Sequence, residues 1–518
     1  MSAIAIIPPE ITPSQPEIRP VVQKPHLPRK GSSAKPSGLA FWMEQVLKEC
    51  ERASVDFAAD PVHDLRVALR RCRSMADGLM AIDPDSNWKK MKKAGKAAFS
   101  SLGELRDVQV MEEWVQQLGE PGDPVSTRLL QYLASREGEL KQQAAKALAA
   151  FDRKQWKRWA MALPRRAARV HQTGVIFRHL ALERWMEAYD LHRKAMRNRS
   201  RLAYHSLRIG IKRFRYIVEN FLPEQHARWS GDLKLLQDLL GEVHDLDVLW
   251  TTALQVNAFP NTDSRVRWHK KIIEERERRI TQYRDKMLGE GSLWREWRAQ
   301  LPHGEEIEAA ALARLKLWAA FLDPDVRHSM QVARLALQLY DGLAVHHRQQ
   351  RAELRTLLKV AAWMHEVGRS RKAKNHHKAG YRLIANLKAP LGYNQAELHQ
   401  AAAIARYHRG ALPHAGQKSL TGFTAAQRRT LLRLAGILRL AEAFDFDHKG
   451  RIHRLTVHDY PHWIEITAAG YSLRDRHAEN IAGARHLLET VYRKPIIVKP
   501  ERTHSLSLRR VVQRASRS

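Results

Sequence analysis

The sequence has few cysteines and no long apolar run. Its 518 residues include only two cysteines, Cys50 and Cys72, too few for a disulfide framework and more typical of a reducing compartment. No stretch of about 18 consecutive apolar residues occurs, so the sequence predicts no transmembrane helix. The short apolar stretch near the N-terminus lacks the length and the preceding cation of a signal peptide. We therefore expect a cytoplasmic protein that does not enter a membrane.

Acidic residues are scarce relative to basic ones. The chain has 88 Lys and Arg against 55 Asp and Glu, a formal net charge of +33. This balance attracts polyanions such as nucleic acid, an anionic membrane surface or polyphosphate, and it says nothing about the fold. Single-stranded nucleic acid also needs exposed aromatic rings beside the basic groups. The basic segments described below offer only Phe214 and Tyr216, so nucleic acid is the less favoured partner, although charge alone leaves it open.

The spacing of apolar residues predicts a mainly α-helical chain. Residues 1–37 are rich in Pro, Ser and Lys and lack periodicity, so we expect a disordered tail there. From residue 38 to about 300, apolar residues recur every three or four positions, which is typical of helices that pack in a bundle. Pro302 and Gly304 mark the junction with a second domain.

The second domain is expected to span residues 308–500 and to be helical with a small β appendage. Apolar residues alternate between Ile452 and Ala468, which predicts two strands around a turn. A helix near 476–492 and a short apolar strand at 495–498 would complete this domain. The remaining residues, 501–518, form a basic tail.

Two basic segments repeat along the first domain. HDLRVALRRCR (His63–Arg73) and HSLRIGIKRFR (His205–Arg215) lie 142 residues apart and share their His and basic positions. Downstream of them, LGELRDVQV matches LGEVHDLDV in the same order, with Lys96 and Lys234 seven residues before the respective glycines. Two dispersed matches in one order predict an internal duplication, with one helical bundle in residues 38–170 and another in 171–300.

The shared positions lie at intervals of three and four residues and therefore form one stripe of an α-helix. Burying such a row of cations without counter-charge would cost several kcal/mol per ion. Either carboxylates from another helix neutralise the row, or an anionic ligand does, and guanidinium groups suit phosphate oxygens. Asp107 and Asp245, in the downstream blocks, are candidates for carboxylates that orient the arginines. A solvated basic surface is the remaining alternative.

At these residues the chain resembles the CHAD family, the conserved histidine α-helical domain, on the words HxxRxxxRRxR, HxxRxxxKRxRY and two LGExxDxxV blocks. The resemblance implies a pseudo-two-fold helical domain that binds inorganic polyphosphate in a basic central channel. It also implies association with polyphosphate granules, with no catalysis and no cofactor in this domain. The binding residues that it implies are His63, Arg66, Arg70, Arg71, Arg73, Lys96, His205, Arg208, Lys212, Arg213, Arg215 and Lys234.

The C-terminal half contains a second ordered set of polar residues. Histidines and carboxylates lie in its helical segments, as a metal-dependent phosphohydrolase would require. The words HSMQVARLALQLYD, AAWMHEVG, HKAGYRLI, RYHRGALP and LRLAEAFD resemble the HD-like C-terminal domain of exopolyphosphatase and guanosine-pentaphosphatase proteins. The resemblance implies a divalent metal held by His328, His365, Glu366 and Asp445.

Three departures from the HD pattern favour a degenerate site. Glu366 and Glu442 stand where the parent superfamily has aspartate, and the histidine-rich word that begins at His377 lacks one histidine. An extra methylene moves a carboxylate by about an ångström, which catalysis tolerates poorly. No GxxxxGK[ST] loop or other Gly-rich phosphate cradle precedes this domain. We therefore expect an accessory domain that forms a homodimer or adds polyphosphate contacts; the alternative is a metal-dependent phosphohydrolase acting on polyphosphate or a phosphorylated nucleotide.

Overall fold

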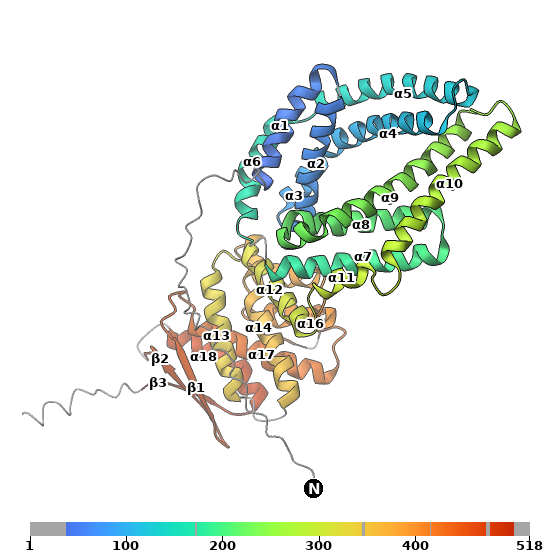
Figure 1. Ribbon diagram of the computed structural model, residues 1–518. Helices are drawn as coiled ribbons and strands as arrows, with labels where there is room; N and C mark the ends of the chain where they lie inside the picture. Colours follow the sequence, from blue (N-terminus) through green and yellow to red (C-terminus); the bar gives the residue numbers. More distant parts are fainter. Residues whose placement is uncertain are drawn as a thin grey trace, which may run out of the picture.

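The computed structural model describes residues 38–57, 59–170, 174–343, 348–414, 416–472 and 477–501. The tail expected at 1–37 and the tail expected at 501–518, except for Glu501, lie outside these residues. Within the described part, the chain is mainly α-helical with one three-stranded sheet near its C-terminus, so the predicted fold class is confirmed (Figure 1). None of the described helices is long and apolar enough to cross a membrane.

The first repeat begins with a helical hairpin and continues with a longer pair. Aspartates cap three of its helices. Asp85 accepts from Asn87 N and Asp152 from Gln155 N, both at 2.8 Å, and Asp123 precedes Pro124, whose fixed φ suits a first helical position. The helices of this repeat are α1 (Leu39–Asp56), α2 (Ala59–Met80), α3 (Ser86–Ala94), α4 (Lys96–Leu118), α5 (Pro124–Ala149) and α6 (Arg153–Ala167).

The second repeat has the same order of helices with one difference, since a single long helix replaces α3 and α4. Gly210 allows its first two helices to approach closely, because a Cβ there would lie 3.2 Å from the Cα of Ala188. The helices are α7 (Val175–Asn198), α8 (Arg201–Phe221), α9 (Pro223–Gln255), α10 (Thr262–Met287) and α11 (Leu293–Ala299).

The two repeats meet through equivalent helices. In each repeat the helix with the basic segment packs on the preceding helix, α2 on α1 and α8 on α7. In addition α2 contacts α8, and α4 contacts α9. Figure 1 shows the layer of α4 and α5 above the layer of α8, α9 and α10. The four helices with the repeated words therefore lie at the centre of the N-terminal domain.

The C-terminal domain has its own hydrophobic core, which begins near Leu315, whereas the first core extends from Leu39 to Leu301 with Phe321 added. The domain contains a helical cluster and a sheet, and Gly342 lets α13 lie directly on Val457 of β1. Its elements are α12 (Glu305–Leu322), α13 (Val326–Leu343), α14 (Arg348–Met364), α15 (His376–Ala385), α16 (Gln395–Arg406), α17 (Ala425–Phe444), β1 (Arg454–Asp459), β2 (Ile464–Ala469), α18 (His477–Tyr492) and β3 (Ile496–Pro500).

The sheet has the order β1-β2-β3. The β1 and β2 strands pair antiparallel, with Val457 opposite Ile466, and β2 and β3 pair parallel, with Ile464 opposite Ile496. Helix α18 makes the crossover that a parallel pair requires. The strands predicted at 452–468 and 495–498 are therefore present.

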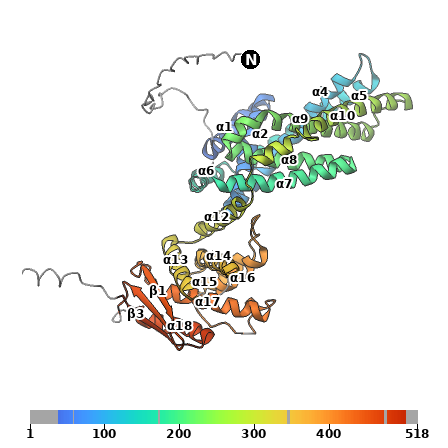
Figure 2. The same ribbon diagram turned by 60° about the horizontal axis from the view of Figure 1, so that its bottom comes forward.

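Helix α12 connects the two domains and packs against α7 (Figure 2). Arg314 of α12 binds Glu183 of α7 at 2.8 Å and donates to the carbonyl of Ala81 at 3.2 Å. Glu183 also accepts from Leu391 N at 3.1 Å. These polar contacts tie α7 of the first domain to the loop before α16 in the second.

Candidate functional site

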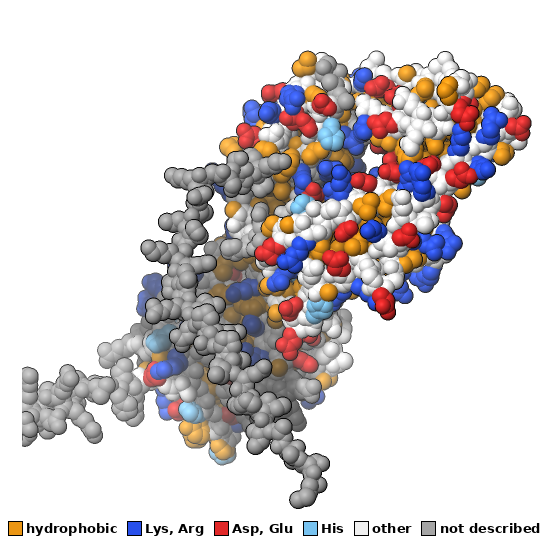
Figure 3. All heavy atoms as spheres, in the orientation of Figure 1, with side chains coloured by type: hydrophobic (Ala, Val, Ile, Leu, Met, Phe, Trp, Pro, Cys, Tyr) orange, Lys and Arg blue, Asp and Glu red, His pale blue; other side chains and the backbone are white. Residues whose placement is uncertain are grey.

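A cavity of about 370 Å³ lies between α2, α4, α8 and α9. Both repeats contribute to it, and its lining is rich in charged groups. The lining residues are Arg66, Phe99, Ser100, Gly103, Glu104, Asp107, Met111, Arg208, Lys212, His244, Asp245 and Val248. Figure 3 shows Lys and Arg side chains, in blue, bordering the hollow between the two helical layers.

The cations of this cavity repel one another. Arg66 of α2 is half-buried and donates to the carbonyls of Leu102 and Gly103, at 3.0 and 3.4 Å. Burial and, after it, the nearby guanidinium groups, Arg208 first, together lower the pKa of Lys212 to about 8. A lysine whose pKa falls this far below its ordinary value lacks sufficient counter-charge.

Three carboxylates line the cavity with these cations, Glu104, Asp107 and Asp245, and the two aspartates have raised pKa values. Burial is the main cause at Asp107, opposed by the attraction of Arg66 and Arg208. Burial also raises the pKa of Asp245 to about 6, with Arg208 opposing it. In the described part of the chain, no carboxylate forms an ion pair within 4.0 Å of Arg66, Arg208 or Lys212. Among the described residues, these three cations are therefore not neutralised by ion pairs with carboxylates, which was one of the alternatives that the sequence allowed.

Other predicted binding residues have protein partners or lie apart. Arg71 and Arg215 share Glu219, at 2.5 and 4.0 Å, and Arg73 donates to the carbonyl of Lys92 at 2.8 Å. Half-buried His205 lies beside His244, with 4.8 Å between the ring centroids.

A second cavity of about 370 Å³ is lined by Arg213, Lys92, Arg184 and Tyr216, among others. Arg213 therefore belongs to a different hollow from Arg208 and Lys212. The exposed members of the predicted set are His63, Lys96, Arg213 and Lys234, while Arg70 is half-buried near Lys212. The structure thus brings together the middle of the two basic segments and separates their ends.

The C-terminal domain gathers four histidines and two glutamates into two adjoining triads. In the first, Glu442 Oε2 lies 3.1 Å from His328 Nε2 and 3.0 Å from His365 Nε2. In the second, Glu366 Oε1 lies 3.0 Å from His376 Nε2 and 3.4 Å from His408 Nε2. The triads adjoin because His365 and Glu366 are consecutive residues, with one member in each.

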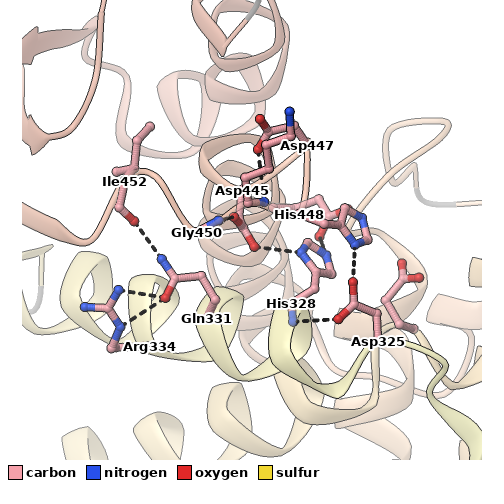
Figure 4. Close-up of polar contacts among 12 residues, drawn as sticks. Asp325, His328, Gln331, Arg334, Asp445, Asp447, His448, Gly450 and Ile452 are labelled. Atoms are coloured by element: carbon pink, nitrogen blue, oxygen red, sulfur yellow. Dashed lines mark hydrogen bonds and ion pairs between the residues drawn. The ribbon is translucent and has the colours of Figure 1, made fainter.

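Each histidine is oriented through its other ring nitrogen. The Nδ1 atoms of His365, His376 and His408 lie 2.6, 3.2 and 2.7 Å from the backbone carbonyls three residues earlier. His328 Nδ1 contacts Asp445 Oδ2 at 2.9 Å, and the His448 ring stacks on His328 with 3.7 Å between centroids (Figure 4). Such partners hold a histidine tautomer that presents Nε2, as metal-binding histidines require.

The electrostatics of these triads also suit a cation. Burial lowers the pKa of His408 well below its usual value, so its imidazole is neutral. Burial works against ionised Glu442, but its hydrogen bonds from His328 and His365 hold the pKa of that carboxyl well below normal. Glu366 is only 1% exposed, and neither of its oxygens has a hydrogen bond of good geometry among the described residues, although Arg369 forms an ion pair with it. His328 differs, because burial is outweighed by its hydrogen bonds to Asp445 and Glu442, which raise its pKa to about 9, so a metal ion would have to replace its Nε2 proton. Deprotonated imidazoles and buried carboxylates are the donors that divalent metals bind.

The predicted metal set is only partly what the structure brings together. His328, His365 and Glu366 lie in the triads, but Asp445 lies behind His328, where its two oxygens accept from His328 Nδ1 and Gly450 N. The predicted set of ligands lacked His376, His408 and Glu442, which complete the triads. The available signal was their order along the chain, since His408 and Glu442 lie in words quoted above and His376 directly precedes the word that begins at His377. The sequence predicted that the word beginning at His377 lacks one histidine. In the structure, the preceding residue, His376, lies in the second triad.

Comparison with known families agrees with both halves of the structure. Residues 39–254 match the CHAD domain, and residues 316–474 match Ppx/GppA phosphatase, domain III. No curated protein matches the chain. The matched segments include the basic cavity and both histidine triads respectively. The chain therefore combines a segment that matches the CHAD domain with a segment that matches domain III of the Ppx/GppA phosphatases.

Proposed function

We propose that the N-terminal domain binds inorganic polyphosphate in the cavity between α2, α4, α8 and α9. The observation that supports this most directly is the meeting of Arg66 with Arg208 and Lys212, one from the first repeat and two from the second, without a paired carboxylate. A linear chain of phosphates would supply closely spaced negative charges to both repeats at once. A polyphosphate chain that is bound to one repeat is held at a high effective concentration near the other repeat, so long polyphosphate chains bind more tightly than short ones.

Polyphosphate suits this cavity better than nucleic acid does. Phe99 is the only Phe, Tyr or Trp among the described lining residues, and the Arg73 guanidinium already covers its ring at 5.2 Å, while the His244 ring lies against His205. Base stacking therefore has no free platform there. The proposal extends to a cytoplasmic protein that associates with polyphosphate granules, with Arg70 and His205 extending the contact from the cavity.

A length series of polyphosphates, measured by calorimetry at constant salt, tests this function. Arg66→Ala combined with Arg208→Ala should weaken binding of long chains at least tenfold while the melting temperature is retained, since neither residue has a carboxylate partner. Exposed Arg158 of α6 offers a matched control, and Arg158→Ala should bind as wild type does. Equal affinity for short and long chains, with halved stoichiometry in Arg208→Ala, would show two independent sites instead of one channel.

A second candidate function, metal-dependent phosphohydrolysis in the C-terminal domain, is favoured by the completeness of the two triads. His328, His365 and Glu442 would hold one divalent ion, and Glu366, His376 and His408 another. A bound divalent ion lowers the pKa of a coordinated water and so supplies hydroxide near neutral pH. Among this chain's own residues, Asp445 keeps His328 oriented, and Arg369 beside Glu366 offers positive charge to a phosphate.

Metal analysis of the purified protein, followed by phosphate release from polyphosphate and nucleotides, separates this candidate from an accessory role. We expect His365→Ala to lose both metal and activity while polyphosphate binding in the first domain is unchanged. An accessory domain would contain no metal and release no phosphate, and it would leave dimerisation as the role to examine by light scattering.

A further inference from the structure

A third cavity, of about 470 Å³, lies on the N-terminal domain between α7, the turn that follows α10, and α11. Its lining differs from that of the basic channel because aromatic rings dominate it. The residues that matter below are Trp185 and Tyr189 of α7, Trp294 and Arg295 of α11, and Arg298. Neither the polyphosphate channel nor the histidine triads includes any of them.

Three rings form one wall of this pocket. Trp185 and Tyr189 are one helical turn apart, and their rings stack with centroids 5.0 Å apart and 11° between the planes. Trp294 meets both edge-on, at 5.8 and 5.5 Å. Arg298 lies over the Trp185 ring at 6.0 Å and His192 lies 6.0 Å from the Tyr189 ring, but Tyr189 remains 37% exposed, so part of its ring is open to a ligand. A flat ring can pack against this exposed part, and Leu288, which also lines the pocket and is 43% exposed, extends the apolar area.

The charges around the pocket determine the sign of the ligand. Arg295, Arg298 and His303 line it, and none of the described lining residues is acidic. An aromatic wall without arginines could hold a cation, but these guanidinium groups would repel one. Arg298 is already held in place, because it donates to the carbonyls of Leu301 and Pro302 at 3.3 and 3.1 Å. A phosphate or carboxylate would therefore meet an ordered guanidinium group.

Two lining residues, Trp185 and Trp294, have a buried indole Nε1 without a hydrogen bond of good geometry among the described residues. Tyr283 lies near the Trp294 nitrogen, so Trp185 is the donor that most needs an acceptor. A buried donor without an acceptor costs about 1–3 kcal/mol of stability, so such groups commonly mark a ligand site. A ring ligand with a nitrogen or carbonyl acceptor would satisfy it.

We propose that this pocket binds a mononucleotide, with its base against the exposed part of Tyr189 and its phosphates toward Arg295 and Arg298. The volume lies within the range of about 300–1,000 Å³ that is usual for small-ligand sites. Inorganic polyphosphate has no ring to stack and does not use this pocket. The proposal is therefore independent of the channel, and the two sites can be occupied together.

The test measures binding of adenosine and guanosine triphosphates to the full chain by calorimetry, with inorganic triphosphate as the phosphate-only probe. Arg208→Ala serves as the background, because it weakens phosphate binding in the channel. In that background we expect Tyr189→Ala to weaken nucleotide binding about tenfold, the usual effect of removing one stacking partner. Tyr189→Phe, which keeps the ring, should bind as its parent does. Tyr132→Ala, at a tyrosine of α5 with 40% exposure, is the matched control and should also change nothing.

Several outcomes would overturn the proposal. If inorganic triphosphate displaces the nucleotide and binds as tightly as the nucleotide does, the nucleotide binds in the channel through its phosphates. If Tyr189→Ala and Tyr132→Ala change the nucleotide affinity equally, and both variants melt at the parent temperature, the Tyr189 ring does not contact the nucleotide. A single-stranded oligonucleotide that binds far more tightly than the mononucleotide, still through Tyr189, would assign the surface to nucleic acid.

Discussion

The ammonium group of Lys212 makes a pH-dependent affinity for polyphosphate the sharpest prediction from the channel. In the free protein, burial and the guanidinium groups of Arg208 and Arg70 lower its pKa to about 8. A bound polyanion favours the charged form and restores the pKa toward its ordinary value. Binding above pH 8 therefore requires uptake of a proton, and the affinity falls as the pH rises through the pKa of the free protein.

The size of this effect follows from that pKa. At pH 7 nearly every Lys212 is protonated before binding, whereas at pH 9, one unit above about 8, roughly one in ten is. The apparent affinity should therefore fall about tenfold between pH 7 and pH 9 at constant ionic strength. Lys212→Arg keeps the positive charge throughout this range and should show little of the decrease.

Calorimetry in two buffers of different ionisation enthalpy measures both the affinity and the number of protons taken up. At pH 9 we expect close to one proton per channel in wild type and none in Lys212→Arg. A wild-type affinity that is flat from pH 7 to pH 9, or an equal decrease in Lys212→Arg, would refute the position of Lys212 in the anion site.

The remaining predictions concern a channel carboxylate, the packing of helices and the histidine triads. The pKa of Asp245 is about 6 in the free protein, and a bound anion raises it, so the affinity of wild type for polyphosphate should increase as the pH falls from 7 to 5. Asp245→Asn should bind polyphosphate more tightly than wild type at pH 7 and should show no such increase in the same titration. Gly210→Val should lower the free energy of unfolding by about 1–3 kcal/mol in urea denaturation, because the added atoms meet α7. The control Gly231→Ala, where a Cβ meets nothing within 4 Å, should stabilise α9 slightly. Equal effects of the two substitutions would contradict the close contact between α7 and α8. If the triads bind metal, Asp445→Asn should weaken that binding about 10–100-fold in competition with a chelator, since it orients His328, and unchanged affinity would leave Asp445 without that role.

The sequence by itself determined the class of structure and the location of the repeats. Helical periodicity is a local property, so it predicts α-helices without knowledge of their partners. The repeated words His63–Arg73 and His205–Arg215 mark equivalent helices for the same reason, and α2 and α8 contain them. Alternation between Ile452 and Ala468 likewise predicted the β1–β2 hairpin.

Tertiary structure decided which basic residues lack a partner. Helical spacing treats Arg66, Arg73 and Arg215 as equivalent, yet Arg73 binds the carbonyl of Lys92 and Arg215 lies 4.0 Å from Glu219. The Lys92 carbonyl belongs to another helix, so the stripe pattern does not identify it, whereas Glu219 follows Arg215 by four residues on the same face of α8 and could have been found from the spacing. Only the packing of α2 against α8 places Arg66 in one cavity with the cations of the second repeat.

The same limit explains the histidine triads. The sequence offers His376 and His377 as neighbours about 100° apart on one helix, and only the position of α15 directs His376 toward Glu366. Asp445 follows α17 by one residue and resembles a ligand, but its carboxylate reaches the far side of the His328 ring. Residue type and order along the chain determined which chemistry is available here, and the three-dimensional direction of each side chain decided which atoms can act together.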